Sequence, residues 1–226
     1  MNTTPSLTCD PGLEPRTVRA ALIWGLGLSD CPKTFSAPGY ISELLQRVRA
    51  AGEGFLSPGR KAAVRGMLRF GNYKPAGRSK PSSEYLLSAA LQNDFPLVNG
   101  PVDVNNAVSL EWGYPASIFD MELSGSAFLL RRGQAGESYV FNPSGQVISL
   151  EDLLCVCRLE AGNWIPCGNP VKDAMATKIE ESTRDVAAVI YAPVSEASVD
   201  LAAAAERFAI LLRSECRAAQ IGWRIE

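Results

Sequence analysis

Residues 102–120 read VDVNNAVSLEWGYPASIFD, and the interpretation of the fold starts from this stretch. Apolar side chains recur at helical spacing from Val102 to Trp112, and Gly113-Tyr114-Pro115 ends that helix because glycine and proline do not continue it. Beyond Pro115 the pattern changes from helical to β character. The stretch therefore marks the boundary between a helical half and a β half of the chain.

The chain before this boundary is mostly helical. The spacing of apolar residues predicts helices over 40–51, 59–70 and 82–91. In the last of these, Ser82 or Ser83 is the expected cap, and Tyr85, Leu86 and Ala89 are expected to face inward. The run 18–26 predicts a short buried strand, and residues 1–16, which contain three prolines, are expected to be irregular.

The chain after the boundary alternates between short strands and turns. Strands are predicted over 127–131, 138–141, 153–158 and 186–191, followed by a C-terminal helix over 198–218. Helices first, strands next and a final helix predict an α+β fold. No internal repeat or linker divides the sequence, so we expect a single domain over 1–226.

Composition excludes several classes of protein. The 226 residues are 46% hydrophobic and 20% charged, which excludes a disordered or low-complexity chain. No apolar run approaches the roughly 20 residues of a membrane span, and the N-terminus does not resemble a signal peptide. We therefore expect a cytoplasmic protein without membrane association. The absence of histidine excludes Ser-His-Asp and Cys-His catalysis and removes the commonest metal ligand.

Six cysteines raise the question of a metal or redox site. The spacing of Cys155, Cys157 and Cys167 is not a standard zinc pattern, and no histidine can complete a mixed site. We interpret these cysteines as small buried hydrophobic residues, with a redox or metal role as the alternative. No metal and no cofactor is expected.

A basic segment stands out against the formal net charge of −2. Ser57-Pro58 predicts the start of a helix on which Lys61, Arg65 and Arg69 share one face. The loop that follows adds Lys74 and Arg78. A basic helix face beside a basic loop predicts a phosphate-binding surface. The alternative is a solvated helix whose charges pair with acidic neighbours.

Polar side chains interrupt the apolar helix at 102–112. Asp103 and Asn106 share one face and Asn105 and Ser109 another, which is more than packing requires. Ser117 and Asp120 follow the turn and are expected to approach the same region. The alternative is capping and turn chemistry for Asp103, Ser117 and Asp120.

Ordered motifs in this region resemble a known family. The motifs are Val102-Asp103-x-x-Asn106, Gly113-x-Pro115-x-x-x-Phe119-Asp120, Arg131 with Gly136-Glu137, and Thr183-x-Asp185-Val186. Together they resemble the B3/B4 domain of the phenylalanyl-tRNA synthetase β subunit, with a motif core over 97–193. The flanking segments, such as Tyr73-Lys74-Pro75, resemble its free-standing relatives. The resemblance implies a three-layer β/β/α fold, here with an N-terminal helical region. It also implies hydrolysis of tyrosine wrongly esterified to phenylalanine tRNA, with no metal required.

The resemblance also assigns residues to an editing pocket. Asn106 matches an asparagine of that pocket, whereas Ser117 stands where the synthetase has histidine and Val189 where it has glutamate. Tyr191 replaces a small residue and is expected to narrow the pocket. The resemblance thus implies that Asn106 and Ser117 position ester and water, and that Asp103 or Asp120 orders the loop. The remaining landmark pair, Arg131 and Glu137, is expected to be a framework salt bridge.

Three functions remain open from the sequence. The first is hydrolysis of misacylated aminoacyl-tRNA in trans, with tRNA phosphates on the basic helix face and loop. The second is a non-catalytic tRNA-binding or protein-binding module, favoured by the missing histidine and glutamate. The third is a small-molecule site for an amino-acid-like ligand, favoured by the acidic isoelectric point of 5.4.

Overall fold

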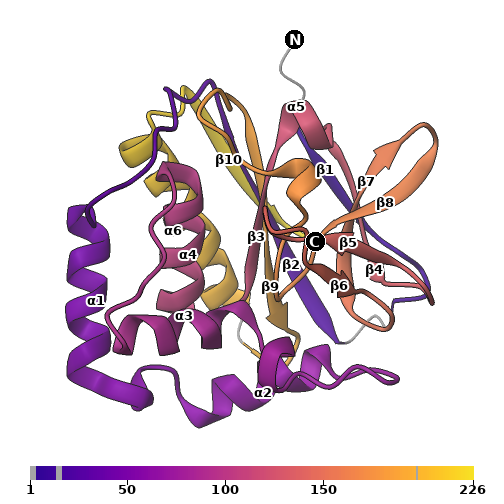
Figure 1. Cartoon of the computed structure of the whole chain (residues 1–226), viewed down its shortest axis with the longest axis horizontal. Coiled ribbons are helices and arrows are strands. Elements are labelled where there is room, and N and C mark those ends of the chain that lie inside the picture. The colour runs from indigo at the N-terminus through magenta and orange to yellow at the C-terminus, as the bar shows by residue number, and fades with distance from the viewer. Residues whose placement is uncertain (1–3, 14–16, 197) are drawn as a thin grey trace.

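The computed structural model describes residues 4–13, 17–196 and 198–226. Figure 1 shows three layers: helices, a central sheet and an outer sheet. The expected α+β class and the β/β/α layering are therefore confirmed. Within the described residues, a continuous apolar core lies between the layers.

The central sheet has the strand order β10-β2-β9-β3 and is antiparallel throughout. Its strands are β2 (Val18–Leu26), β3 (Ala116–Asp120), β9 (Val186–Pro193) and β10 (Gln220–Ile225). Every residue of β9 is buried, because helices cover one face of the sheet and the outer sheet covers the other. Strand β3 lies at one edge of this sheet, which leaves one side of its backbone without a strand partner.

The outer sheet has the order β1-β4-β7-β8, in which β1 pairs with β4 in parallel and the other pairs are antiparallel. Its strands are β1 (Ser6–Cys9), β4 (Ala127–Arg132), β7 (Leu154–Glu160) and β8 (Asn163–Gly168). A separate hairpin is formed by β5 (Ser138–Val140) and β6 (Val147–Ser149). The rings of Phe119 and Phe128 stack between the two sheets with centroids 5.5 Å apart.

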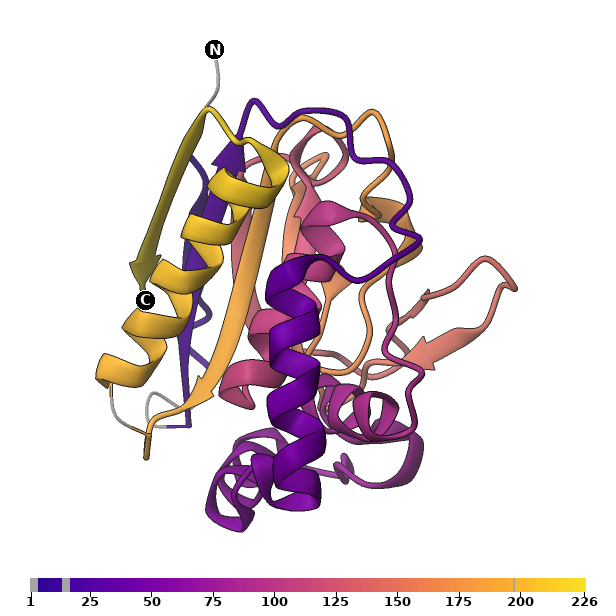
Figure 2. The same ribbon diagram turned by 90° about the vertical axis from the view of Figure 1, so that its left-hand side faces the viewer.

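The helical layer packs on the central sheet. Its longer helices are α1 (Gly39–Ala51), α2 (Pro58–Leu68), α3 (Ser82–Leu91), α4 (Gly100–Trp112) and α6 (Ser198–Cys216). Short helical turns are η1 (Gly52–Phe55), η2 (Gly77–Ser79), α5 (Met121–Ser124) and η3 (Met175–Thr177). Figure 2 shows α1 in front of the other helices, where it shares a second apolar cluster with α3 and α4.

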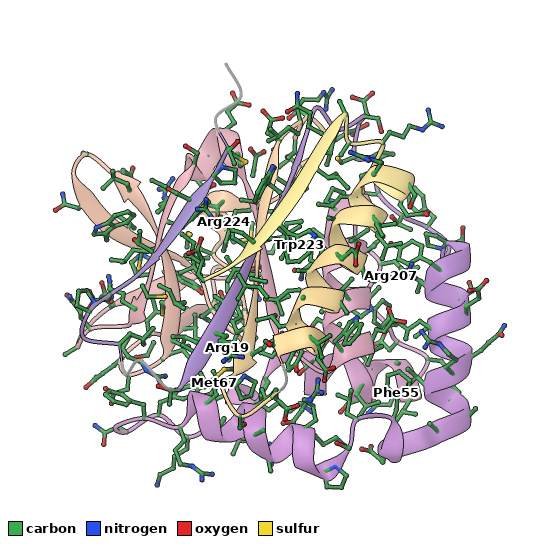
Figure 3. All side chains as sticks on the ribbon, turned by 180° about the vertical axis from the view of Figure 1, so that it is seen from behind. Arg19, Phe55, Met67, Arg207, Trp223 and Arg224 are labelled. Carbon is green, nitrogen blue, oxygen red and sulfur yellow. The ribbon has the colours of Figure 1, made fainter. Side chains whose placement is uncertain are left out.

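The rear of the molecule shows how the helices are tied together. Figure 3 shows β10 with Trp223 and Arg224 at the sheet edge, and α6 with Arg207 beside it. The Nε atom of Arg207 lies 3.5 Å from an Oε2 of Glu111, so an ion pair joins α6 to α4. No helix in the described part of the chain is long and apolar enough to span a membrane.

Several expectations about the elements need correction. Part of the segment 1–16 is not irregular, because residues 6–9 form β1 with Leu7 buried in the core; residues 1–3 and 14–16 lie outside the described part. The sequence pattern did not predict the strands β3, β6, β8 and β10. Two of these strands contain a residue type that is rare inside strands: β10 contains Gly222 and β8 contains Pro166.

The helix boundaries also differ in places that matter for the site. Helix α2 ends at Leu68 and Arg69 has an extended backbone, so Arg69 leaves the face that Lys61 and Arg65 share. Helix α3 begins after Pro81 without a side-chain cap, and its Tyr85 is 53% exposed instead of facing inward. The predicted cap of α2 is confirmed, since the Ser57 side chain accepts a hydrogen bond from the backbone of Arg60.

Candidate functional site

A cleft with a volume of ≈ 1770 Å³ opens where the free edge of β3 meets the helical layer and the hairpin. Its walls come from the loop 72–80, the first turns of α3 and α4, the β5–β6 hairpin and the segment 169–179. These pieces are far apart in the sequence and meet only in the folded chain. The cleft is large enough for a ligand of several chemical groups.

The basic loop is fixed in place at both ends. The Asp152 carboxylate accepts a hydrogen bond of 2.7 Å from the backbone of Asn72, and the Tyr73 hydroxyl donates one of 2.6 Å to the Ser79 carbonyl. Gly71 has φ +48°, and a Cβ there would lie 2.1 Å from the Asp152 carboxylate, so only glycine fits this approach. These hydrogen bonds fix the conformation of the loop, which forms one wall of the cleft.

The predicted phosphate-binding residues divide into two groups. Lys61 pairs with Glu53 at 3.5 Å, and Arg65 makes a bidentate ion pair with the buried Glu84. The basic helix face therefore follows the alternative interpretation, in which its charges pair with acidic neighbours. Lys74 lies on the wall of the cleft instead, as does Arg78.

Further lysines line the same cleft: Lys80, Lys172 and Lys178. Lys80 follows the basic loop and donates a hydrogen bond of 3.2 Å to Ser88 Oγ, whereas no feature of the sequence pointed to Lys172 and Lys178. Burial and the positive charge of Arg78 both lower the pKa of Lys172, which shows that these two cations lie close together. The Lys172 ammonium also lies 3.7 Å from the centroid of the Phe141 ring. We call Lys74, Arg78, Lys172 and Lys178 the cation cluster. In the described part of the chain, none of its members forms a salt bridge.

Two asparagines of α4 face the cleft. Asn106 is partly exposed, and its Oδ1 accepts a hydrogen bond of 3.4 Å from Asn105 Nδ2. Asn105 is 6% exposed and also donates, at 3.4 Å, to the carbonyl of Ala116 on β3. The free edge of β3 therefore positions Asn105, and Asn105 in turn orients Asn106.

The structure places Ser117, Val189 and Tyr191 together but apart from Asn106. Ser117 pairs with Val189 across β3 and β9, and the Tyr191 hydroxyl lies 2.9 Å from Ser117 Oγ. These three side chains are buried between the two sheets, because alternation along β3 sends Ser117 to the face opposite Ala116. Tyr191 thus occupies space between the sheets, and Ser117 is not among the residues that line the cleft.

Asp103 and Asp120 make structural contacts. The Oδ1 atom of Asp103 accepts a hydrogen bond of 2.7 Å from the backbone of Val98, ahead of α4. Asp120 caps α5 at the backbone of Glu122 and accepts a hydrogen bond of 2.5 Å from the Thr183 hydroxyl. Neither carboxylate lines the cleft, which agrees with the alternative of capping and turn chemistry.

Among the described residues, two carboxyl groups line the cleft, those of Glu151 and Asp173, and sequence reasoning missed both. Asp173 is the one that contacts β3. Its Oδ2 accepts a hydrogen bond of 3.1 Å from the backbone of Ile118 on the free edge of β3. Burial raises its pKa to about 7, although the hydroxyl of Ser117 and the backbone N–H groups of Ile118 and Asn169 oppose that shift. No pattern in the sequence indicates this burial, since Asp173 follows an Asn-Pro turn in which exposed aspartates are common.

The segment that carries Asp173 is shaped by Asn169. Its Oδ1 accepts hydrogen bonds of 2.8 and 2.9 Å from the backbones of Val171 and Lys172, and its amide contacts the Tyr139 hydroxyl. This turn carries both Lys172 and Asp173, and both residues line the cleft. One short segment therefore supplies both a cation and a buried acid.

Five of the six cysteines are buried free thiols, whereas Cys9 on β1 is exposed. Burial raises the pKa of Cys157 to about 12 and that of Cys167 well above its ordinary value, so both thiols are protonated at neutral pH. No group of potential metal ligands is found in the described residues. The expected framework pair is present, since Arg131 makes hydrogen bonds of 2.6 and 2.8 Å to Glu137.

Comparison with known proteins decides the family. The family model for the B3/4 domain matches residues 73–209, more than half of the chain. This chain belongs to the B3/4 domain family. A search of curated proteins gives no match.

A solved structure with a similar arrangement is an N-terminal fragment of the phenylalanyl-tRNA synthetase β-subunit from Pyrococcus horikoshii. It is 9% identical with a TM-score of 0.48, and the alignment covers 99% of this chain and 52% of that one. This chain therefore spans about half the length of that fragment.

The residues that the family model matches include the cation cluster and exclude the basic residues of α2. The cation cluster lies within the matched residues of the B3/4 domain, as do α4, β3 and β9. Lys61 and Arg65 on α2 lie outside it, in the N-terminal helical region. The cleft is thus a feature of the B3/4 domain itself.

Proposed function

We propose that this B3/4 domain binds aminoacylated tRNA in the cleft and hydrolyses a misplaced aminoacyl ester in trans. The observation that carries the proposal is the cation cluster, whose four members line the same cleft as Asn105 and Asn106 and form no salt bridge in the described part of the chain. Clustered cations without counterions are favourable only when an anion approaches, and phosphates are the anions of a nucleic-acid strand.

The chemistry requires water to attack the ester carbonyl and the ribose oxygen to leave. The Asn106 side chain, partly exposed and oriented by Asn105, is placed to donate a hydrogen bond to a carbonyl oxygen in the cleft. The vicinal ribose hydroxyl of the tRNA helps to position the water. Tyr191 is buried between the sheets and does not line the cleft, so the expected narrowing of the pocket by Tyr191 does not apply to this site.

A second candidate is binding of tRNA without turnover. It is favoured by one observation: the Ser117 hydroxyl already contacts Tyr191 and the Asn169 carbonyl, so it is not free to hold a water molecule. Val189, on the neighbouring strand, offers no polar group at all. The two candidates share the cation cluster and differ only in catalysis.

Binding is tested through its dependence on salt. Four phosphate contacts predict that the logarithm of the association constant falls by about 3 for each tenfold rise in salt. The Arg78→Ala, Lys172→Ala double variant should reduce this slope to about 1.5 and weaken binding at low salt. Arg49→Ala on α1, an exposed cation outside the cleft, is the matched control and should leave the slope unchanged. An unaltered slope in the double variant would reject the cation cluster as the phosphate site.

Turnover is tested by single-turnover deacylation against a panel of correctly and wrongly charged tRNAs. Faster loss of one aminoacyl ester than the spontaneous rate, abolished by Asn106→Ala, supports hydrolysis in trans. Binding without acceleration for any member of the panel supports the non-catalytic candidate. If the protein neither binds nor deacylates any tRNA of the panel, the assignment returns to a small amino-acid-like ligand.

A further inference from the structure

The free edge of β3 holds two side chains from different parts of the chain. The backbone hydrogen bond from Tyr191 to the Pro115 carbonyl shows that odd-numbered residues of this region pair with β9. Ala116 and Ile118 therefore direct their backbone groups outward, to the amide of Asn105 and the carboxyl of Asp173 respectively. These two anchoring residues are two positions apart, about 7 Å along the strand.

Each of the two side chains leaves one oxygen without a partner. In the part of the chain that the structure describes, Asn105 Oδ1 and Asp173 Oδ1 are buried and make no hydrogen bond. The assignment of the Asn105 oxygen is secure, because its nitrogen donates to the Ala116 carbonyl. Buried polar atoms nearly always have partners, so two such atoms on one edge of a cleft indicate that a ligand supplies them.

The two oxygens define what the ligand must offer. Asn105 Oδ1 is an acceptor, and both oxygens of Asp173 are acceptors when its carboxyl is ionised, so the group missing in that state is a hydrogen-bond donor. One belongs to a carboxyl group, so a positively charged donor is preferred over a neutral one. An anion is excluded from this edge by the carboxylate, although anions are favoured a short distance away at the cation cluster. The ligand therefore carries separate positive and negative groups.

We propose that Asp173 and Asn105 form a binding site for the α-ammonium group of an aminoacyl ester. The assignment rests on the proposed function, in which the phosphates of the same ligand lie on the cation cluster. An ammonium group has three donors and no acceptor, which suits two unpartnered acceptor oxygens of residues that line one cleft. The site thus distinguishes an aminoacyl group with a free amine from one whose amine is blocked or absent.

The experiment compares two non-hydrolysable probes that differ only at this group. The first is 3′-aminoacylamino-3′-deoxyadenosine, prepared with an alanyl and with a tyrosyl side chain. The second is the matching α-hydroxyacyl compound, in which a hydroxyl of similar size replaces the ammonium. Calorimetry with the unaltered protein should show that the amine binds at least about tenfold more tightly, as expected for a charged hydrogen bond.

Variants connect that preference to the proposed residues. Asp173→Asn keeps the shape and an acceptor for Ile118 but removes the charge, and should reduce the preference to within about twofold. Glu151→Gln makes the same change at the other acidic residue of the cleft wall and should leave the preference intact. Urea unfolding of both variants checks that they fold.

The outcomes separate this inference from the proposed function. Equal affinity for amine and hydroxyl probes, absence of binding by either, or an undiminished preference in Asp173→Asn would overturn the ammonium site. If tRNA still binds with the salt dependence given above, only the ammonium assignment fails. If the amine preference depends on Asp173 but tRNA does not bind, the proposed function fails and the ammonium site stands.

Discussion

The buried carboxyl of Asp173 makes a prediction about stability that requires no ligand. Its pKa is raised from 3.8 to about 7 in the folded protein, with burial as the main cause. A raised pKa means that the folded state binds the proton more tightly than the unfolded state does. The free energy of unfolding should therefore fall as pH rises through the window between these two values, and stay low above it.

The size of the effect follows from the same two values. One pKa unit corresponds to about 1.4 kcal/mol, so ionising Asp173 lowers the free energy of unfolding by about 1.5 kcal/mol at pH 5 and about 4 kcal/mol at pH 8. Asp173→Asn retains a neutral side chain of the same shape and removes this ionisation. The difference in stability between the variant and the unaltered protein should therefore grow by about 2.5 kcal/mol from pH 5 to pH 8, in favour of the variant.

Urea unfolding at pH 5, 6, 7 and 8 measures this difference directly. The chain has no histidine, so few other groups titrate in this range, and those that do are shared by both proteins and cancel. The matched control is Glu151→Gln, whose stability relative to the unaltered protein should not change over the same range. A stability difference for Asp173→Asn that is constant between pH 5 and pH 8 would refute the assignment of a buried, proton-binding carboxyl to this position.

Three further predictions concern stability. Glu137→Gln leaves the buried Arg131 without its ionic partner and should lower the free energy of unfolding by about 3 kcal/mol; a loss below about 1 kcal/mol would show that the pair is dispensable. Gly168→Ala brings a Cβ within 2.5 Å of the buried Phe119 ring and should lower the melting temperature. Gly66→Ala, whose Cβ meets open space on α2, should raise the free energy of unfolding by about 1 kcal/mol. Equal effects of the two substitutions on stability would contradict this packing. Tyr191→Phe removes a buried hydroxyl contact and should destabilise by about 1 kcal/mol in urea, with no change expected if Ser117 is fully satisfied by the Asn169 carbonyl.

Local patterns in the sequence were sufficient for much of the architecture. Helical spacing located α1, α4 and α6, because each buries an apolar stripe, α4 and α6 against the sheet and α1 against α3 and α4. The sequence pattern did not predict the edge strands β1 and β10, because β1 is only four residues long and β10 contains a glycine. Such strands owe their conformation to the neighbour with which they pair, and no local pattern records that neighbour.

The site was predicted less completely than the fold. Lys74, Arg78 and Asn106 were located from the basic loop and the polar helix, and all three line the cleft. Asp173 was missed, because its burial depends on contact with a strand more than fifty residues away. The raised pKa of Asp173 arises from its burial against that strand, and the residues next to Asp173 in the sequence do not indicate it.

The sequence by itself determined the α+β class, the absence of histidine chemistry and the motifs of the B3/4 family. These follow from composition, periodicity and ordered motifs, which are local or additive properties of the chain. Only the tertiary structure decided which charges are paired. It joined Arg65 to Glu84, left the cation cluster without counterions, and placed Tyr191 between the sheets. The physical reason is that electrostatic and packing energies depend on distances between residues remote in sequence, and folding alone sets those distances.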